Sequence, residues 1–187
     1  MTLKEFIETV EKDPNELFEA HNANEYIPIT RKAVICNIAT QGVDDTPPAL
    51  IDYDNTGYAT VDSVNKMLYM TMTYLVEYFN VDVGNFSIDE YDSLYKSGTM
   101  SKIDRLAERG SNSKWKKTVC AIQDDFRALE KMLNREIANA LGRINDPYKR
   151  IMQRMTDDLT PEAMQNGVEE LKTVLDEIEQ HKNKKQQ

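Results

Sequence analysis

The residues best suited to chemistry lie between Asp52 and Gly57, where the sequence follows the opening of a calcium-binding EF-hand loop. Such a loop needs acids at positions one and three, an oxygen ligand at position five and glycine at position six. Asp52, Asp54, Thr56 and Gly57 satisfy this pattern, but Ser63 stands where position twelve requires a bidentate glutamate. We therefore favour an acidic turn without a metal. The alternative is a calcium site, whose candidate ligands are Asp52, Asp54 and Thr56.

Catalytic groups are scarce in this chain. His21 and His181 are the only histidines, so no histidine dyad or zinc cluster is expected. Cys36 and Cys120 lie far apart and are expected to be buried free thiols in a reducing compartment. Glu77 is the one charge in an apolar segment, and such carboxylates most often pair with a Lys or Arg. We expect no catalytic residues, no cofactor and no enzymatic activity.

Charge is unevenly distributed along the 187 residues, whose formal net charge is −9. Residues 1–98 hold 6 Lys and Arg against 17 Asp and Glu, a net charge of −11, whereas residues 99–154 hold 13 against 7. One interpretation is that the charged residues form solvated faces and that the acidic and basic halves of the chain attract each other. The sharper one is an acidic surface that docks on a basic partner or imitates a nucleic-acid backbone. Its residues would be Asp44, Asp45, Asp52 and Asp54.

Basic residues surround Trp115, the only tryptophan, and form a candidate basic patch of Arg109, Lys114, Lys116 and Lys117. An aromatic ring among cations could stack a nucleic-acid base while the ammonium groups meet phosphates. Trp115 also begins the apolar seam of a long predicted helix, which favours a ring packed inward. We expect no direct nucleic-acid binding.

A central helix over residues 61–79 is the element around which the rest is expected to pack. Its apolar residues recur at helical spacing and also cover much of the opposite surface, so other elements must shield it. The segment is too short and too rich in Thr and Tyr to span a membrane. The helical face comprises Val64, Leu68, Met72, Leu75 and Phe79.

The remaining sequence predicts a mainly α fold. Capping boxes at Thr2/Glu5 and Ser87/Glu90 begin two helices, and residues 29–40 suggest another. Residues 49–61 read as a short β-hairpin or an extended loop. The seam of Trp115, Val119, Ile122, Phe126, Leu129, Leu133 and Ile137 predicts a long helix over residues 113–141, closed by Gly142.

Domain organisation follows from these elements. Two further amphipathic helices after Gly142 complete a predicted antiparallel bundle or helical hairpin at the C-terminal end. We expect an acidic helical domain at 1–109 and a bundle or appendage at 110–187, with a single domain as the alternative. The N-terminal residues show no secretory signal, so cytoplasmic synthesis is expected.

The order of features between Tyr26 and Tyr95 resembles small accessory proteins of tailed bacteriophages that infect Gram-positive bacteria. The matching segments are Tyr26–Ile29 before a helix, Ile51–Tyr53 at the end of the connection, the helix from Val64 to Phe79 followed by Val81-Asp82, and Glu90–Leu94 before Gly98. The resemblance implies a phage-encoded, non-enzymatic protein that works by contact, in virion assembly or against a host system.

Two functional hypotheses follow. The first is a helical interaction protein, a phage virion or morphogenesis component, that binds itself or neighbouring proteins. The second is an inhibitor of a host nucleic-acid-targeting defence that acts through the acidic surface. Either protein would be found in the virion or the host cytoplasm, without a membrane.

Overall fold

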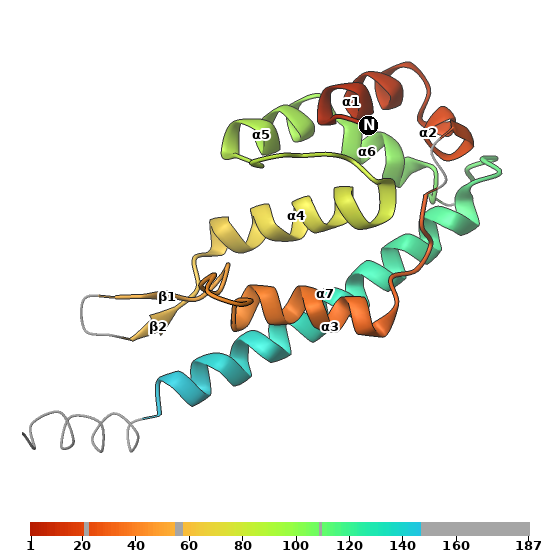
Figure 1. Ribbon diagram of the computed structural model, residues 1–187. Helices are drawn as coiled ribbons and strands as arrows, with labels where there is room; N and C mark the ends of the chain where they lie inside the picture. Colours follow the sequence, from red (N-terminus) through yellow and green to blue (C-terminus); the bar gives the residue numbers. More distant parts are fainter. Residues whose placement is uncertain (21–22, 55–57, 109, 147–187) are drawn as a thin grey trace, which may run out of the picture. The chain divides into compact units, whose positions relative to one another are not determined.

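The computed structural model describes residues 1–20, 23–54, 58–108 and 110–146. Residues 1–144 form one compact unit, and residues 145–187 form a second. The first unit is mainly helical with one two-stranded sheet, as the sequence predicts (Figure 1). Residues 110–113, where a domain boundary was predicted, connect two helices within this unit. The helices predicted after residue 146 lie outside the described residues.

The chain begins with helices α1 (Leu3–Lys12) and α2 (Pro14–Ala20). The predicted capping box is confirmed: Thr2 N–H donates to Glu5 Oε2 over 2.8 Å, and Glu5 N–H donates to Thr2 Oγ1 over 3.3 Å. Asp13 ends α1 in an extended conformation, and the proline that follows it begins α2.

Helix α3 (Ile29–Thr40) leads to the predicted β-hairpin. Its strands β1 (Asp52–Tyr53) and β2 (Ala59–Thr60) pair antiparallel, with Asp52 opposite Thr60. Gly42 makes the turn after α3 at a φ of 76°, in the left-handed region that favours glycine.

Helix α4 (Ser63–Phe79) is the predicted central helix, with Asp62 as its N-cap. Burial is uneven along it, because its buried residues begin at Met70 whereas Val64 is 40% and Met67 46% exposed. The first turns of α4 are therefore less covered than the sequence suggests.

Three helices complete the described unit: α5 (Ile88–Lys96), α6 (Thr99–Arg105) and α7 (Lys116–Ile144). Gly98 adopts a φ of 71°, which ends α5 and precedes α6. Helix α7 continues past Gly142, the predicted end, since a helix tolerates an isolated glycine at modest cost. No helix in the described ranges combines the length and apolar character needed to span a membrane.

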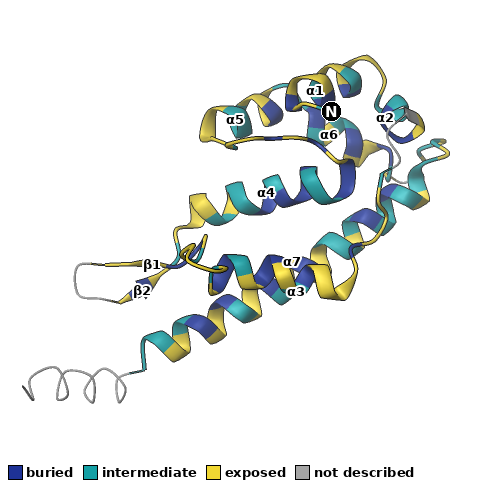
Figure 2. Cartoon of the chain, viewed as in Figure 1, coloured by how far each residue is buried: buried dark blue, intermediate teal, exposed yellow. Residues whose placement is uncertain are grey.

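Within this unit α4 lies between two groups of helices (Figure 1). Helices α3 and α7 pack together on one side, and α1, α5 and α6 pack together on the other. Buried residues of all these helices belong to one hydrophobic cluster with those of α4 (Figure 2). Aromatic rings link the groups: Phe79 lies 5.4 Å from Phe6 and 5.9 Å from Phe18 between ring centroids, and Tyr74 lies 5.0 Å from Phe126.

Candidate functional site

A buried polar junction fixes α3 against α4 and α7. Lys32 on α3 forms an ion pair with Asp125 on α7, and both side chains are less than one-tenth exposed. The other carboxylate oxygen of Asp125 accepts hydrogen bonds from the Tyr78 hydroxyl group over 2.8 Å and from Ile27 N–H over 3.0 Å. Burial opposes ionisation of Asp125, but these hydrogen bonds outweigh it and lower the pKa of the carboxyl group.

A second ion pair joins α3 to α4. Arg31 Nε donates to the two carboxylate oxygens of Glu77 over 3.0 and 3.2 Å, and the same hydrogen bonds raise the pKa of the guanidinium group. Glu77, the sequence candidate for acid–base chemistry, is therefore held in a salt bridge, the outcome the sequence favoured for it.

These two ion pairs neutralise both charges of α3, although the Arg31 side chain remains half exposed. Arg31 and Lys32 are the only charged residues between Tyr26 and Val43, and both are paired with carboxylates of other helices. Apolar side chains occupy the opposite side, with Ile29 62% and Val34 42% exposed. The Lys32 ammonium group also lies 4.8 Å from the centre of the exposed Tyr26 ring. We call the exposed residues Tyr26, Ile29, Thr30, Val34 and Asn37, together with the half-buried Ala33, the α3 face.

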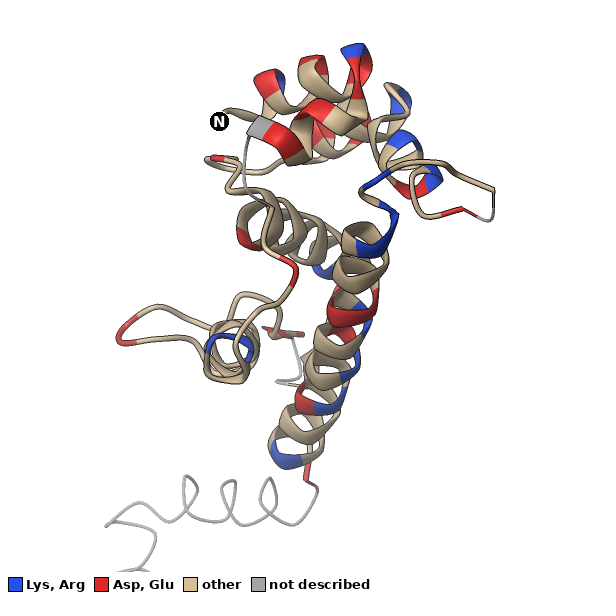
Figure 3. Cartoon of the chain, turned by 90° about the vertical axis from the view of Figure 1, so that its right-hand side faces the viewer, with Lys and Arg blue, Asp and Glu red and all other residues tan. Residues whose placement is uncertain are grey.

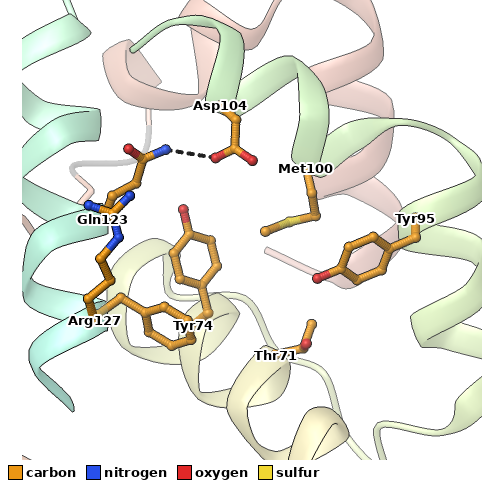
Figure 4. A pocket seen from close by; sticks show the side chains of 8 residues that line it. Thr71, Tyr74, Tyr95, Met100, Asp104, Gln123 and Arg127 are labelled. Carbon is orange, nitrogen blue, oxygen red and sulfur yellow. Dashed lines mark hydrogen bonds between the residues drawn. The ribbon is translucent and has the colours of Figure 1, made fainter. Parts of the chain in front are cut away.

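A pocket of about 260 Å³ lies between α4, α5, α6 and α7 (Figure 4). The hydroxyl groups of Tyr74 and Tyr95 point into it, and Met100 lies between them (Figure 4). Asp104 Oδ1 accepts a hydrogen bond from Gln123 Nε2 over 2.8 Å at the polar end. The pocket is completed by Thr71, Phe126 and Arg127.

Burial controls the ionisation of the tyrosines in this pocket. It raises the pKa of Tyr74, and the carboxylate of Asp104 and the phenol of Tyr95 add to the effect. Burial also raises the pKa of Tyr95, which the adjacent Tyr91 reinforces. Both phenols are therefore neutral at physiological pH and can donate a hydrogen bond.

The residues of the predicted acidic surface occupy two exposed turns. Asp44 and Asp45 lie in the turn closed by the bridge between Val43 and Thr46, and Asp44 has a φ of 53°. Asp52 and Asp54 lie on the hairpin, where Asp54 Oδ1 accepts a hydrogen bond from Tyr58 N–H over 2.8 Å. All four side chains are exposed, and their role as an interaction surface stays a prediction.

The structure describes two of the three candidate metal ligands, Asp52 and Asp54, whereas Thr56 lies outside the described residues. Asp52 Oδ1 accepts from Tyr53 N–H over 2.8 Å, so it stabilises the hairpin backbone, as Asp54 does. Within the described ranges no three His, Cys, Asp or Glu side chains are grouped so that they could hold a metal ion.

The basic patch is distributed around the start of α7. Lys114 pairs with Glu19 over 2.6 Å, Lys116 is half-buried and Lys117 is exposed, whereas Arg109 lies outside the described residues. Trp115 stacks on Phe18 at 5.6 Å between ring centroids, in agreement with the inward packing favoured above. Basic and acidic residues are interspersed along the rest of α7 (Figure 3).

Sequence reasoning missed both the Asp125 junction and the pocket. Asp125 occurs in the long-helix segment as one of two adjacent aspartates. It lies three residues after Ile122 and four before Leu129, so helical spacing places it beside the apolar seam, whereas the exposed Asp124 lies on the opposite side. This spacing, together with the two charges inside the predicted helix over residues 29–40, is the signal that could have indicated the junction.

No protein family model matches the chain, and neither the curated proteins nor the solved structures contain a match to it.

Proposed function

We propose that this protein is a non-enzymatic interaction protein that forms a symmetric dimer through the α3 face, as a virion or morphogenesis component of a bacteriophage. The observation that carries the proposal is the exposed apolar side of a helix whose two cations are both paired with carboxylates, Lys32 in the interior and the half-exposed Arg31 at the surface. The resemblance of residues 26–95 to phage accessory proteins supports the biological setting.

A helix at the edge of a folded unit normally presents polar or charged residues to water. On α3 the exposed positions are apolar at Ile29 and Val34 and uncharged at Thr30 and Asn37. The one exposed charge of the helix, Arg31, is paired with Glu77. Contiguous exposed apolar surface is typical of protein-binding sites. Shielding this surface from water would therefore stabilise a complex.

Charge favours a second copy of the chain as the partner. In a two-fold interface the same patch meets itself, so any net charge on the patch meets a like charge. The chain has a net charge of −9, which makes most of its surface unsuited to such a contact. The α3 face contains no charged residue, so two copies can meet there without repulsion.

The test compares two valines with nearly equal exposure. Val34 on the α3 face is 42% exposed, and Val64 at the start of α4 is 40% exposed. We expect the wild type and Val64→Glu to dimerise with similar affinity, measured by sedimentation equilibrium over a range of concentrations. Val34→Glu would place two carboxylates in the interface and should weaken the dimer by at least roughly tenfold.

Two results would contradict the proposal. One is a wild-type protein that stays monomeric at every concentration up to the millimolar range. The other is a dimer that Val34→Glu and Val64→Glu weaken equally, because the contact would then lie elsewhere. Circular dichroism of both variants checks that each remains folded, and exposed substitutions of this kind typically change stability by less than about 0.5 kcal/mol.

A further inference from the structure

We propose that the pocket between α4, α5, α6 and α7 binds a small organic ammonium ion that carries an aromatic ring. The pocket lies among helices that do not include α3, so the proposal is independent of the dimer. It rests on the size of the pocket, the hydroxyl group of Tyr74 and the arrangement of charge.

The volume of the pocket limits the size of the ligand. A cavity of about 150 Å³ lined by apolar side chains is known to hold benzene. The present pocket, at about 260 Å³, has room for an aromatic ring with a short side chain. Phe126 and Met100 supply apolar wall, and sulfur and aromatic groups both make favourable contacts with a ring.

The hydroxyl group of Tyr74 is open to the pocket and available to a ligand. The residue is 5% exposed, its hydroxyl group points into the pocket (Figure 4), and it makes no hydrogen bond to any described residue. The other tyrosines of α4 use theirs: Tyr78 donates to Asp125 over 2.8 Å, and Tyr69 donates to the carbonyl oxygen of Ile35 over 2.7 Å. A ligand that fills the pocket can therefore replace water as the hydrogen-bond partner of the Tyr74 hydroxyl group.

The charged residues that line the pocket favour a positively charged ligand. Asp104 accepts a hydrogen bond from the neutral Gln123 and forms no ion pair within the described part of the chain. Arg127 also lines the pocket, but its Nη1 forms a surface ion pair with Asp124 over 2.9 Å, in which the Arg127 side chain is 65% exposed. Among the lining residues, the exposed carboxylate of Asp104 is the charged group that forms no ion pair with a described residue. An ammonium group would pair with Asp104, and nearby tyrosine and phenylalanine rings also attract cations.

Three probes with the same ring but different charge test this directly. Phenethylamine is a cation, 2-phenylethanol is neutral and phenylacetate is an anion, and each is titrated into the full chain by two-dimensional NMR. We expect amide signals of the pocket residues to shift with phenethylamine, with an affinity at least about tenfold higher than for 2-phenylethanol. Phenylacetate should cause no saturable shift.

Substitutions of the lining residues then identify the side chains that contact the ligand. Asp104→Asn should weaken phenethylamine binding by about tenfold or more and leave 2-phenylethanol unaffected, because only the charged hydrogen bond is lost. Tyr74→Phe should weaken both. Asp45→Asn, which removes a carboxylate from an exposed turn outside the pocket, is the matched control and should change neither.

The proposal is wrong if none of the three probes shifts the pocket signals at millimolar concentration, or if phenylacetate binds more tightly than phenethylamine. The second result would show that Arg127 dominates and that the pocket takes anions. The comparison of probes on the wild type needs no variant, so it decides the question even if a substituted protein fails to fold.

Discussion

Tyr78 and Tyr74 lie one turn apart on α4, and only Tyr78 uses its hydroxyl group within the described structure. Tyr78 donates to Asp125 Oδ2 over 2.8 Å and so connects α4 to α7. Tyr74 is also buried, but its hydroxyl group faces the pocket. Two identical side chains of one helix therefore have different surroundings, one in the polar junction and one in the wall of the pocket.

The first prediction compares these two tyrosines. Tyr78→Phe should lower the free energy of unfolding by about 1.5–3 kcal/mol, because a hydrogen bond to a charged acceptor is lost. Tyr74→Phe should change it by less than about 0.5 kcal/mol, since no bond to a described residue is removed. Urea unfolding followed by circular dichroism measures both. Equal losses in the two variants would contradict the assigned roles.

The second prediction concerns acid unfolding. The pKa of Asp125 is lowered below the ordinary value of 3.8 in the folded state. A lowered pKa stabilises the fold above the unfolded-state value, and that contribution is lost as the pH falls through the folded-state value. Asp125→Asn should therefore be less stable than the wild type at pH 7, by about 3–5 kcal/mol for a broken buried pair.

The pH dependence distinguishes this contribution from general loss of packing. The difference between wild type and Asp125→Asn should shrink as urea unfolding is measured from neutral pH down to well below pH 3.8. Asp13, whose pKa is also lowered, through hydrogen bonds from Asn15, is present in both proteins and cancels. A difference that stays constant over this range would show that ionisation of Asp125 is not involved.

The third prediction separates the two thiols. Burial raises the pKa of Cys36 to about 11, and the residue is 1% exposed, so its thiolate is scarce and shielded. Cys120 is only partly buried. Iodoacetamide should modify Cys120 in the folded protein and Cys36 only after unfolding in urea. Mass spectrometry of tryptic peptides locates the label, and rapid labelling of Cys36 without urea would disagree with the packing of α3 on α7.

The fourth prediction compares two glycines with positive φ. A Cβ atom at Gly42 would overlap the carbonyl oxygen of Thr46, whereas one at Gly84 would have no atom within 4 Å. Gly84→Ala should cost about 1–2 kcal/mol from backbone strain alone. Gly42→Ala should cost more, because the turn before the hairpin must also move. Thermal unfolding compares them, and a smaller loss for Gly42→Ala would be inconsistent with this turn.

Local sequence signals predicted the helices well. The capping box at Ser87 and Glu90 forms with bonds of 2.7 and 3.3 Å, and Gly98 ends α5 where expected. Both depend on contacts within a few residues, so the sequence carries them directly. Five of the seven predicted seam residues of α7 are buried, which follows from helical periodicity.

Long-range pairing explains what the sequence could not predict. Lys32 and Asp125 are 93 residues apart, and only the packing of α3 on α7 brings them together. The exposure of the α3 face could not be predicted either, since Ile29 and Val34 contributed only to a predicted helix and their burial depends on how α3 packs. The pocket combines residues of four helices, among them Tyr95, Asp104 and Gln123, whose spacing follows no motif.

The stacking of Trp115 on Phe18 gives the protein an intrinsic optical probe. The indole is the single one in the chain, and its Nε1 is buried without a hydrogen-bond partner among the described residues. Its emission should therefore be blue-shifted while α2 is docked on the start of α7. A red shift that precedes the loss of helical signal on heating would identify this contact as the first to open.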